Sequence, residues 1–113
     1  GDLLQRIDGI VSQRSTLFEA VAPARRAALV RLHASPVLQK QQKGLAARFR
    51  DQLATTFEPE LSVLDADAAE DLLNLLDLHA SWDTWDRLRT WQGLSPDRAR
   101  QLVSDLITRA LAP

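Results

Sequence analysis

The sequence predicts an all-α domain, and three observations favour it. The 113 residues include 20 leucines and 16 alanines, which are good helix formers, against only 15 β-branched valines, isoleucines and threonines together. Four glycines and five prolines leave few turns. Apolar residues recur at spacings of three and four, the period of one helical face. A chain of this length buries enough surface for one core, so we expect a single bundle-like domain of five helices.

The first helix is expected over residues 2–22, where apolar residues form one stripe. Arg14 interrupts that stripe, so we expect it where the face meets solvent or a partner. Pro23 is expected to end the helix, because its ring and missing N–H are incompatible with a helix interior. A short second helix then covers residues 24–33.

The third helix is expected over residues 36–57. Ser35 and Pro36 form a start signal, since serine caps free N–H groups and proline suits the first helical position. Gly44 marks a bend, because glycine weakens a helix by about 1 kcal/mol relative to alanine. Glu58 and Pro59 then end the helix.

The fourth helix is expected to begin with a capping box at Asp67 and Glu70 and to run to about Trp91. Gly93 followed by Leu94 is typical of a left-handed C-terminal cap with an apolar contact after it.

The fifth helix begins at a second serine–proline signal, Ser95 and Pro96, with Asp97 favoured by the helix dipole. Its apolar stripe is wide for a C-terminal helix. The stripe comprises Ala99, Leu102, Val103, Leu106, Ile107, Ala110 and Leu111.

The fourth helix is apolar over most of its circumference, so it must be covered on more than one side. The chain's own helices cover one side, and a second copy or a bound apolar molecule covers the other. Two adjacent antiparallel helices with spare apolar surface favour a two-fold interface, in which the last two helices form a four-helix bundle across a homodimer. The alternative is that both helices are central in a compact monomer.

The charge is unevenly distributed along the chain. Residues 1–57 carry a net charge of +5 and residues 58–113 a net charge of −6. The basic residues are spread over several helices without interleaved aromatic residues, which favours solvated faces attracting each other over a nucleic-acid surface.

Catalytic and metal-binding motifs are absent from the sequence. Without cysteine there are no disulfides or thiolate sites, and we expect no metal and no cofactor. His79 and Asp83 supply only two ligands, too few for a metal site. We therefore expect no enzyme activity. No transmembrane segment or leader is present in the sequence, and we expect a cytoplasmic protein without membrane contacts.

One enzyme alternative remains. The run from Leu3 to Arg14 resembles the first helix of the all-helical chorismate mutases, which bind a dicarboxylate through arginines and a lysine. The resemblance covers about twelve residues of common helix sequence. A structural helical dimer without a ligand is the other alternative.

The C-terminal third resembles a specific family. The run from His79 to Arg89 contains a Ser-aromatic-acid-x-Trp-x-x-Leu-Arg pattern, and Gln92 to Pro96 contains a Gly-Leu-Ser turn. Together they resemble the last two helices of TetR-type bacterial transcriptional regulators. The Pro-x-Arg-Arg segment at Pro23 and the helix start at Ser35 are similar too.

This resemblance implies a C-terminal regulatory domain that dimerises through its last two helices and binds a small, mostly apolar effector. Operator DNA would be bound only by an N-terminal helix-turn-helix domain that this chain lacks. The absence of methionine, including at position 1, agrees with a piece of a longer protein. Expected ligand-binding residues are Leu17, Phe18, Phe49, Leu53, Asn74, Leu75, Leu78, His79 and Trp82. Expected interface residues are Trp85, Leu88, Leu102, Val103, Leu106, Ile107 and Leu111.

Overall fold

A computed structural model of the chain describes the backbone of residues 1–32 and 35–112, and the side chains of residues 1–27 and 35–112. Helices are the only regular secondary structure in these residues, which confirms the predicted all-α class. The elements are α1 (Leu3–Leu32), α2 (Pro36–Thr56), α3 (Glu58–Leu61), α4 (Ala66–His79), α5 (Trp82–Asp86), the π-helical turn η1 (Arg87–Trp91) and α6 (Pro96–Leu111). The described residues therefore contain more helical elements than the five expected.

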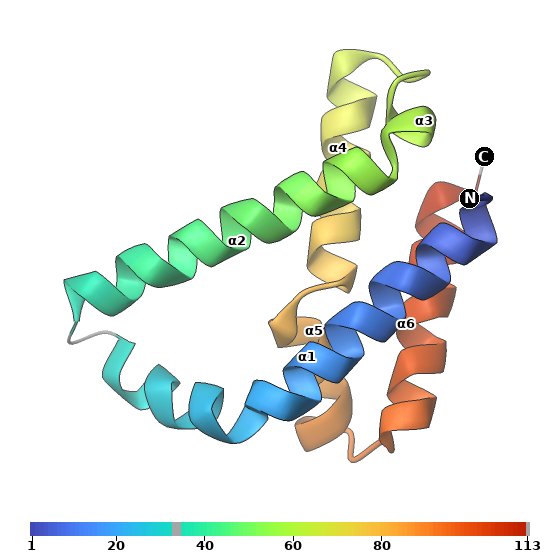
Figure 1. Cartoon of the computed structure of the whole chain (residues 1–113). Coiled ribbons are helices and arrows are strands. Elements are labelled where there is room, and N and C mark those ends of the chain that lie inside the picture. The colour runs from blue at the N-terminus through green and yellow to red at the C-terminus, as the bar shows by residue number, and fades with distance from the viewer. Residues whose placement is uncertain (33–34, 113) are drawn as a thin grey trace.

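The core lies where α1, α4, α5 and α6 meet the C-terminal part of α2. Helices α1 and α4 both pack on α6, while α2 packs on α1 and α4. Ile7, Leu53, Leu76 and Ile107 are among its fully buried side chains. The C-terminal part of α1 and the N-terminal part of α2 extend together away from α4 and α6 (Figure 1).

Helix α1 continues through Pro23, so the predicted end of the first helix at residue 22 is wrong. Proline removes one backbone hydrogen bond and bends a helix, and Figure 1 shows α1 bending in this region. Tertiary contacts hold both sides of the bend, because Ala22 is buried and Arg26 donates to Thr90 Oγ1 at 2.9 Å. These contacts offset the cost of the proline. The expected end of a second helix at residue 33 lies outside the described residues.

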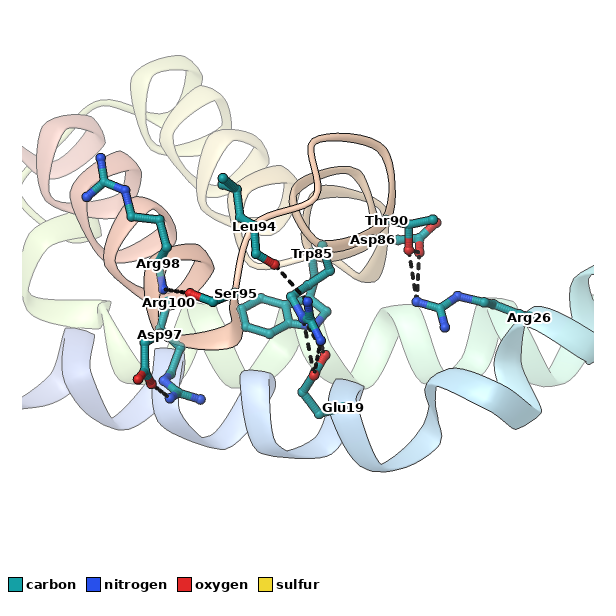
Figure 2. Close-up of polar contacts among 11 residues, drawn as sticks. Glu19, Arg26, Trp85, Asp86, Thr90, Leu94, Ser95, Asp97, Arg98 and Arg100 are labelled. Atoms are coloured by element: carbon teal, nitrogen blue, oxygen red, sulfur yellow. Dashed lines mark hydrogen bonds and ion pairs between the residues drawn. The ribbon is translucent and has the colours of Figure 1, made fainter.

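Both serine–proline helix starts are confirmed. Ser35 Oγ accepts a hydrogen bond from the backbone N–H of Leu38 at 3.2 Å at the start of α2. Ser95 Oγ accepts one from the N–H of Arg98 at 3.1 Å at the start of α6 (Figure 2). The glycine cap before α6 is also confirmed, because Gly93 has a φ of 70°.

Helix α4 begins two residues before the predicted capping box. Asp65, rather than Asp67, is the N-cap, and its carboxylate accepts from the backbone N–H of Ala68 at 2.8 Å. Both Asp65 and Asp67 are suitable N-cap residues, so the local sequence does not show which of them begins the helix. Asp67 lies in the first turn instead.

The predicted fourth helix is interrupted at Ala80 and Ser81, and this break was not anticipated. Ser81 caps α5, because its Oγ accepts from the N–H of Thr84 at 3.2 Å and donates to the carbonyl of Leu78 at 2.7 Å. The carbonyl of Ala80 is bound by Arg14 of α1 at 3.0 Å. Serine competes with helical hydrogen bonds in this way, and a buried donor stabilises the carbonyl that is left free.

The break changes which face of α4 is buried. Leu76 is fully buried, whereas Leu75 and Leu78 are 44% and 57% exposed. On α6 the buried residues are Ala99, Val103 and Ile107. Leucines therefore remain on the outer surface of α4 within the single chain.

Ion pairs link the two oppositely charged halves of the chain. Of the six pairs among the described residues, four join a basic residue before position 58 to an acidic residue after it. They are Arg6–Glu60, Arg26–Asp86, Arg50–Glu70 and Arg50–Asp77. This is the pattern expected if the two halves attract each other.

Candidate functional site

A groove runs between α1 and α2, and its walls are mostly apolar. Its volume is about 350 Å³, within the size range of small-molecule sites. Leu17, Phe18, Val21 and Ala24 line it from α1, and Leu45 and Phe49 from α2, together with Arg25 and Gln42. Successive turns of two helices thus supply one continuous apolar lining.

A smaller and more polar cavity of about 170 Å³ adjoins the groove. The two share Arg25, Gln42, Leu45 and Phe49 as walls. The cavity then extends to the break between α4 and α5, where Ser81 lies. Its remaining lining residues are Arg14, Ala46, Asp77, Trp82 and Asp83. The site therefore has an apolar end and a charged end.

Aromatic rings stiffen the wall between the groove and the core. Phe18 packs edge-on against Phe49, with ring centroids 6.1 Å apart, and edge-on against Trp82, at 5.7 Å. Such edge-to-face pairs are a favoured aromatic geometry. Phe18 and Trp82 are buried while Phe49 is half-buried, so the site is preformed rather than assembled from mobile surface groups.

Arg14 is only 3% exposed, so the expectation that it meets solvent is wrong. Its guanidinium donates to the carbonyl of Ala80 at 3.0 Å, to the carbonyl of Phe49 at 2.9 Å and to Gln52 Oε1 at 3.2 Å. It also lies over the Phe49 ring, 4.3 Å from the centroid. Burial lowers the pKa of Arg14 from its ordinary value. One side chain thus links α1, α2 and the α4–α5 break.

Arg25 forms the boundary between groove and cavity. Its guanidinium lies 5.2 Å from the centre of the Trp82 ring and donates to the side-chain oxygen of Gln42. Its Nε is buried without a hydrogen-bond partner. Burial lowers the pKa of Arg25, against the opposing effect of the Asp83 charge. Neither Arg14 nor Arg25 forms an ion pair with a carboxylate of the described residues.

The expected ligand-binding residues are only partly brought together. Leu17, Phe18 and Phe49 line the groove, and Trp82 lines the adjoining cavity. Leu53 is fully buried in the core, and Asn74, Leu75 and Leu78 are exposed on α4, away from both cavities. His79 is half-buried beside a separate void of about 10 Å³, and burial lowers its pKa.

The sequence patterns did not predict the polar lining, which comprises Arg14, Arg25, Gln42, Asp77, Ser81 and Asp83. The interruption of an apolar stripe by Arg14 was the available signal. This signal did not predict that Arg14 is buried, because burial depends on the Ala80 carbonyl that it binds, and that residue lies 66 positions away in the sequence.

The expected dimer residues divide into two groups. Trp85, Leu88, Val103 and Ile107 are buried by the chain's own helices. Leu102, Leu106 and Leu111 are half-buried. Leu75 and Leu111 also line a wide depression of about 500 Å³ between α4 and the end of α6. Among the expected interface residues, the half-buried group is the one with surface to offer a second chain, and the exposed Leu75 and Leu78 of α4 add to it.

Two residues of the sequence motif at positions 79–89, Trp85 and Arg89, form hydrogen bonds that connect α5 and η1 to α1. Glu19 of α1 accepts hydrogen bonds from Trp85 Nε1 at 2.8 Å and from Arg89 Nη2 at 2.9 Å (Figure 2). Arg89 Nη1 also donates to the carbonyl of Leu94 at 2.7 Å. The hydrogen bond from Arg89, followed by that from Trp85, holds the pKa of Glu19 below its usual value. These motif residues fix α1 against the turn that leads into α6.

The described residues contain no group of three or more side chains able to hold a metal ion. Nor do they contain a helix with the length and apolar character needed to cross a bilayer. Comparison with known proteins found no matching family model, no matching curated protein and no matching solved structure. The function must therefore be argued from the groove and the helices around it.

Proposed function

We propose that the chain is the effector-sensing and dimerisation domain of a TetR-type bacterial transcriptional regulator in the cytoplasm. Its operator DNA would be bound by a helix-turn-helix domain outside this chain. The observation that carries the proposal is the preformed apolar groove of about 350 Å³ between α1 and α2. A groove of that size with a few polar groups at one end is typical of a small-molecule site.

The hydrogen bonds around the groove connect the groove helices to other helices, so a bound ligand could change the relative positions of these helices. Arg14 joins both groove helices to the α4–α5 break, and Glu19 joins α1 to α5 and η1. A ligand that separates α1 from α2 acts on both connections. Coupling of about 1–3 kcal/mol between ligand and DNA sites is sufficient for regulation. In a dimer, such a shift alters the spacing of two DNA-binding domains on adjacent half-sites.

The second half of the proposal is a homodimer through the outer surface of α4 and α6. Leu75 and Leu78 are exposed on α4, and Leu102, Leu106 and Leu111 are half-buried on α6. Contiguous exposed apolar surface of this kind is typical of an interaction site. The same surface on two chains makes a self-complementary two-fold contact.

A groove-filling variant tests ligand binding. Ala24 lines the groove and Ala20 does not, although both are exposed on α1. The neutral fluorescent probe N-phenyl-1-naphthylamine should bind the chain saturably. Ala24→Trp should weaken its binding by about tenfold or more, or 1.4 kcal/mol, whereas Ala20→Trp should leave it unchanged. Absence of saturable binding, or equal effects of the two variants, would contradict the proposed site.

A charge variant tests the dimer. Leu106→Lys should shift the sedimentation mass from two chains to one, because a charge at a covered apolar contact is costly. Leu4→Lys is the matched control, since Leu4 is 71% exposed on α1. A mass of one chain for the unmodified protein, or of two chains for Leu106→Lys with its helical circular dichroism retained, would contradict the interface.

A further inference from the structure

The charged end of the site contains two cations with no anion of their own. Arg14 and Arg25 both line the adjoining cavity, and neither is ion-paired with a carboxylate of the described residues. Burying a cation without an ionic partner is costly, so such groups usually find compensation. Arg14 is compensated by carbonyl and amide oxygens, but its full positive charge remains.

Arg25 is compensated less completely. Its hydrogen bond to Gln42 uses terminal nitrogens, and its buried Nε has no partner. The two terminal nitrogens carry four N–H groups, more than the single oxygen of Gln42 satisfies, and a carboxylate accepts parallel hydrogen bonds from two guanidinium nitrogens. The Trp82 ring, 5.2 Å away, restricts the plane in which the guanidinium lies.

The acidic groups near the cavity do not reverse this charge. Asp77 is half-buried, attracts Arg14 electrostatically, and has its Oδ2 3.7 Å from Arg50 Nη1, so its charge is shared between two arginines. Asp83 is exposed at the start of α5, where solvent screens its charge. The fully buried charge of the cavity is therefore that of Arg14, with the half-buried Arg25 beside it.

We infer that the ligand is an amphipathic anion, with a carboxylate bound at Arg25 beside Arg14 and an apolar body along the α1–α2 groove. This inference rests on the proposed function, because it names the chemistry of that same site. Continuity of the groove and the cavity through Arg25, Gln42, Leu45 and Phe49 lets one molecule occupy both. A neutral ligand of the same shape would leave the charges of Arg14 and Arg25 without an ion pair.

Three probes with the same chain length and different head groups show how much of the binding affinity comes from the head group and how much from the apolar tail. Octanoate, 1-octanol and octylamine are titrated into the chain by isothermal calorimetry below their aggregation concentrations. Octanoate should bind about tenfold or more tightly than 1-octanol, because a charge-assisted hydrogen bond is about twice as strong as a neutral one. Octylamine should bind most weakly, because the arginines repel it.

Arg25→Gln should remove the preference for octanoate over 1-octanol, because it should weaken octanoate binding by about tenfold more than it weakens 1-octanol binding. Arg48→Gln is the matched control, because Arg48 is exposed on α2 and lines neither the groove nor the cavity. Thermal melts of both variants establish that each remains folded. Retention of the octanoate preference in Arg25→Gln would overturn the inference.

The remaining outcomes distinguish the two proposals. Equal binding of octanoate and 1-octanol, or preferred binding of octylamine, would overturn the anionic head group but leave the groove as a ligand site. Absence of binding by all three probes would overturn both the head group and the proposed sensing function.

Discussion

Replacement of Arg14 by methionine tests whether this side chain holds α1, α2 and the α4–α5 break together. Methionine is similar in length but cannot donate hydrogen bonds. The carbonyl of Ala80, which accepts from Arg14 at 3.0 Å, would lose this donor inside the protein. The contact over the Phe49 ring, at 4.3 Å, would lose its charge.

The expected destabilisation follows from these contacts. A buried acceptor left without a donor costs about 1–3 kcal/mol. Loss of the cation–π contact adds about 0.5–2 kcal/mol. Removal of the buried charge recovers part of this lost stability, since burial disfavours the charged guanidinium. We therefore expect a net loss of roughly 2 kcal/mol in the free energy of unfolding. At this chain length that lowers Tm by about 8 °C.

Urea denaturation followed by circular dichroism measures this free energy, and tryptophan fluorescence reports the combined surroundings of Trp82, Trp85 and Trp91. Arg48→Met is the matched control, because Arg48 is exposed on α2 and should change stability by less than about 0.5 kcal/mol. If Arg14→Met unfolds within about 0.5 kcal/mol of the unmodified chain, Arg14 does not hold the three segments together.

Three further substitutions test the local structure. Glu19→Gln should lower the free energy of unfolding by about 1 kcal/mol at pH 7, because a neutral amide binds Arg89 more weakly than a carboxylate does. The pKa of Glu19 is lowered in the folded chain, so this stabilisation is present above the ordinary value of 4.5 and is lost as the pH falls through the folded value. The penalty in urea denaturation should therefore shrink at low pH, and a penalty unchanged with pH would contradict the ion pair. Gly93→Ala should destabilise by about 1 kcal/mol because φ is 70°, whereas Gly44→Ala, in a helix with open space around it, should stabilise by about 0.5–1 kcal/mol. Thermal melts that move in the same direction for both would contradict this conformational assignment. Ser95→Ala should lower the free energy of unfolding by about 1 kcal/mol through loss of the α6 cap, and an unchanged urea midpoint would refute that role.

Local signals predicted the helix ends that depend on neighbouring residues. The caps at Ser35 and Ser95 and the left-handed Gly93 were predictable because each satisfies backbone groups within a few residues. The continuation through Pro23 was not predictable in this way. It depends on contacts between α1 and the distant segment that contains Thr90.

The same distinction applies to the candidate site. Helical periodicity predicted Leu17, Phe18 and Phe49 on inward-facing stripes, and the family resemblance implied that such residues line a ligand site. These three line the groove, whereas Leu53, selected in the same way, is buried in the core. The charged end was not predictable, because the position of Arg14 depends on the break at Ala80 and on a carbonyl of α2. Periodicity also assumed an unbroken fourth helix, and this assumption assigned the exposed Leu78 to the ligand site.

We propose that the groove between α1 and α2 holds an amphipathic ligand with its anionic end at Arg25. A crystal structure of the chain with octanoate would show the position of both ends of the ligand. We expect a carboxylate within hydrogen-bond distance of Arg25 and an alkyl chain packed against Phe18 and Leu45. An empty groove in crystals saturated with octanoate, or octanoate bound only in the depression beside Leu111, would contradict the claim.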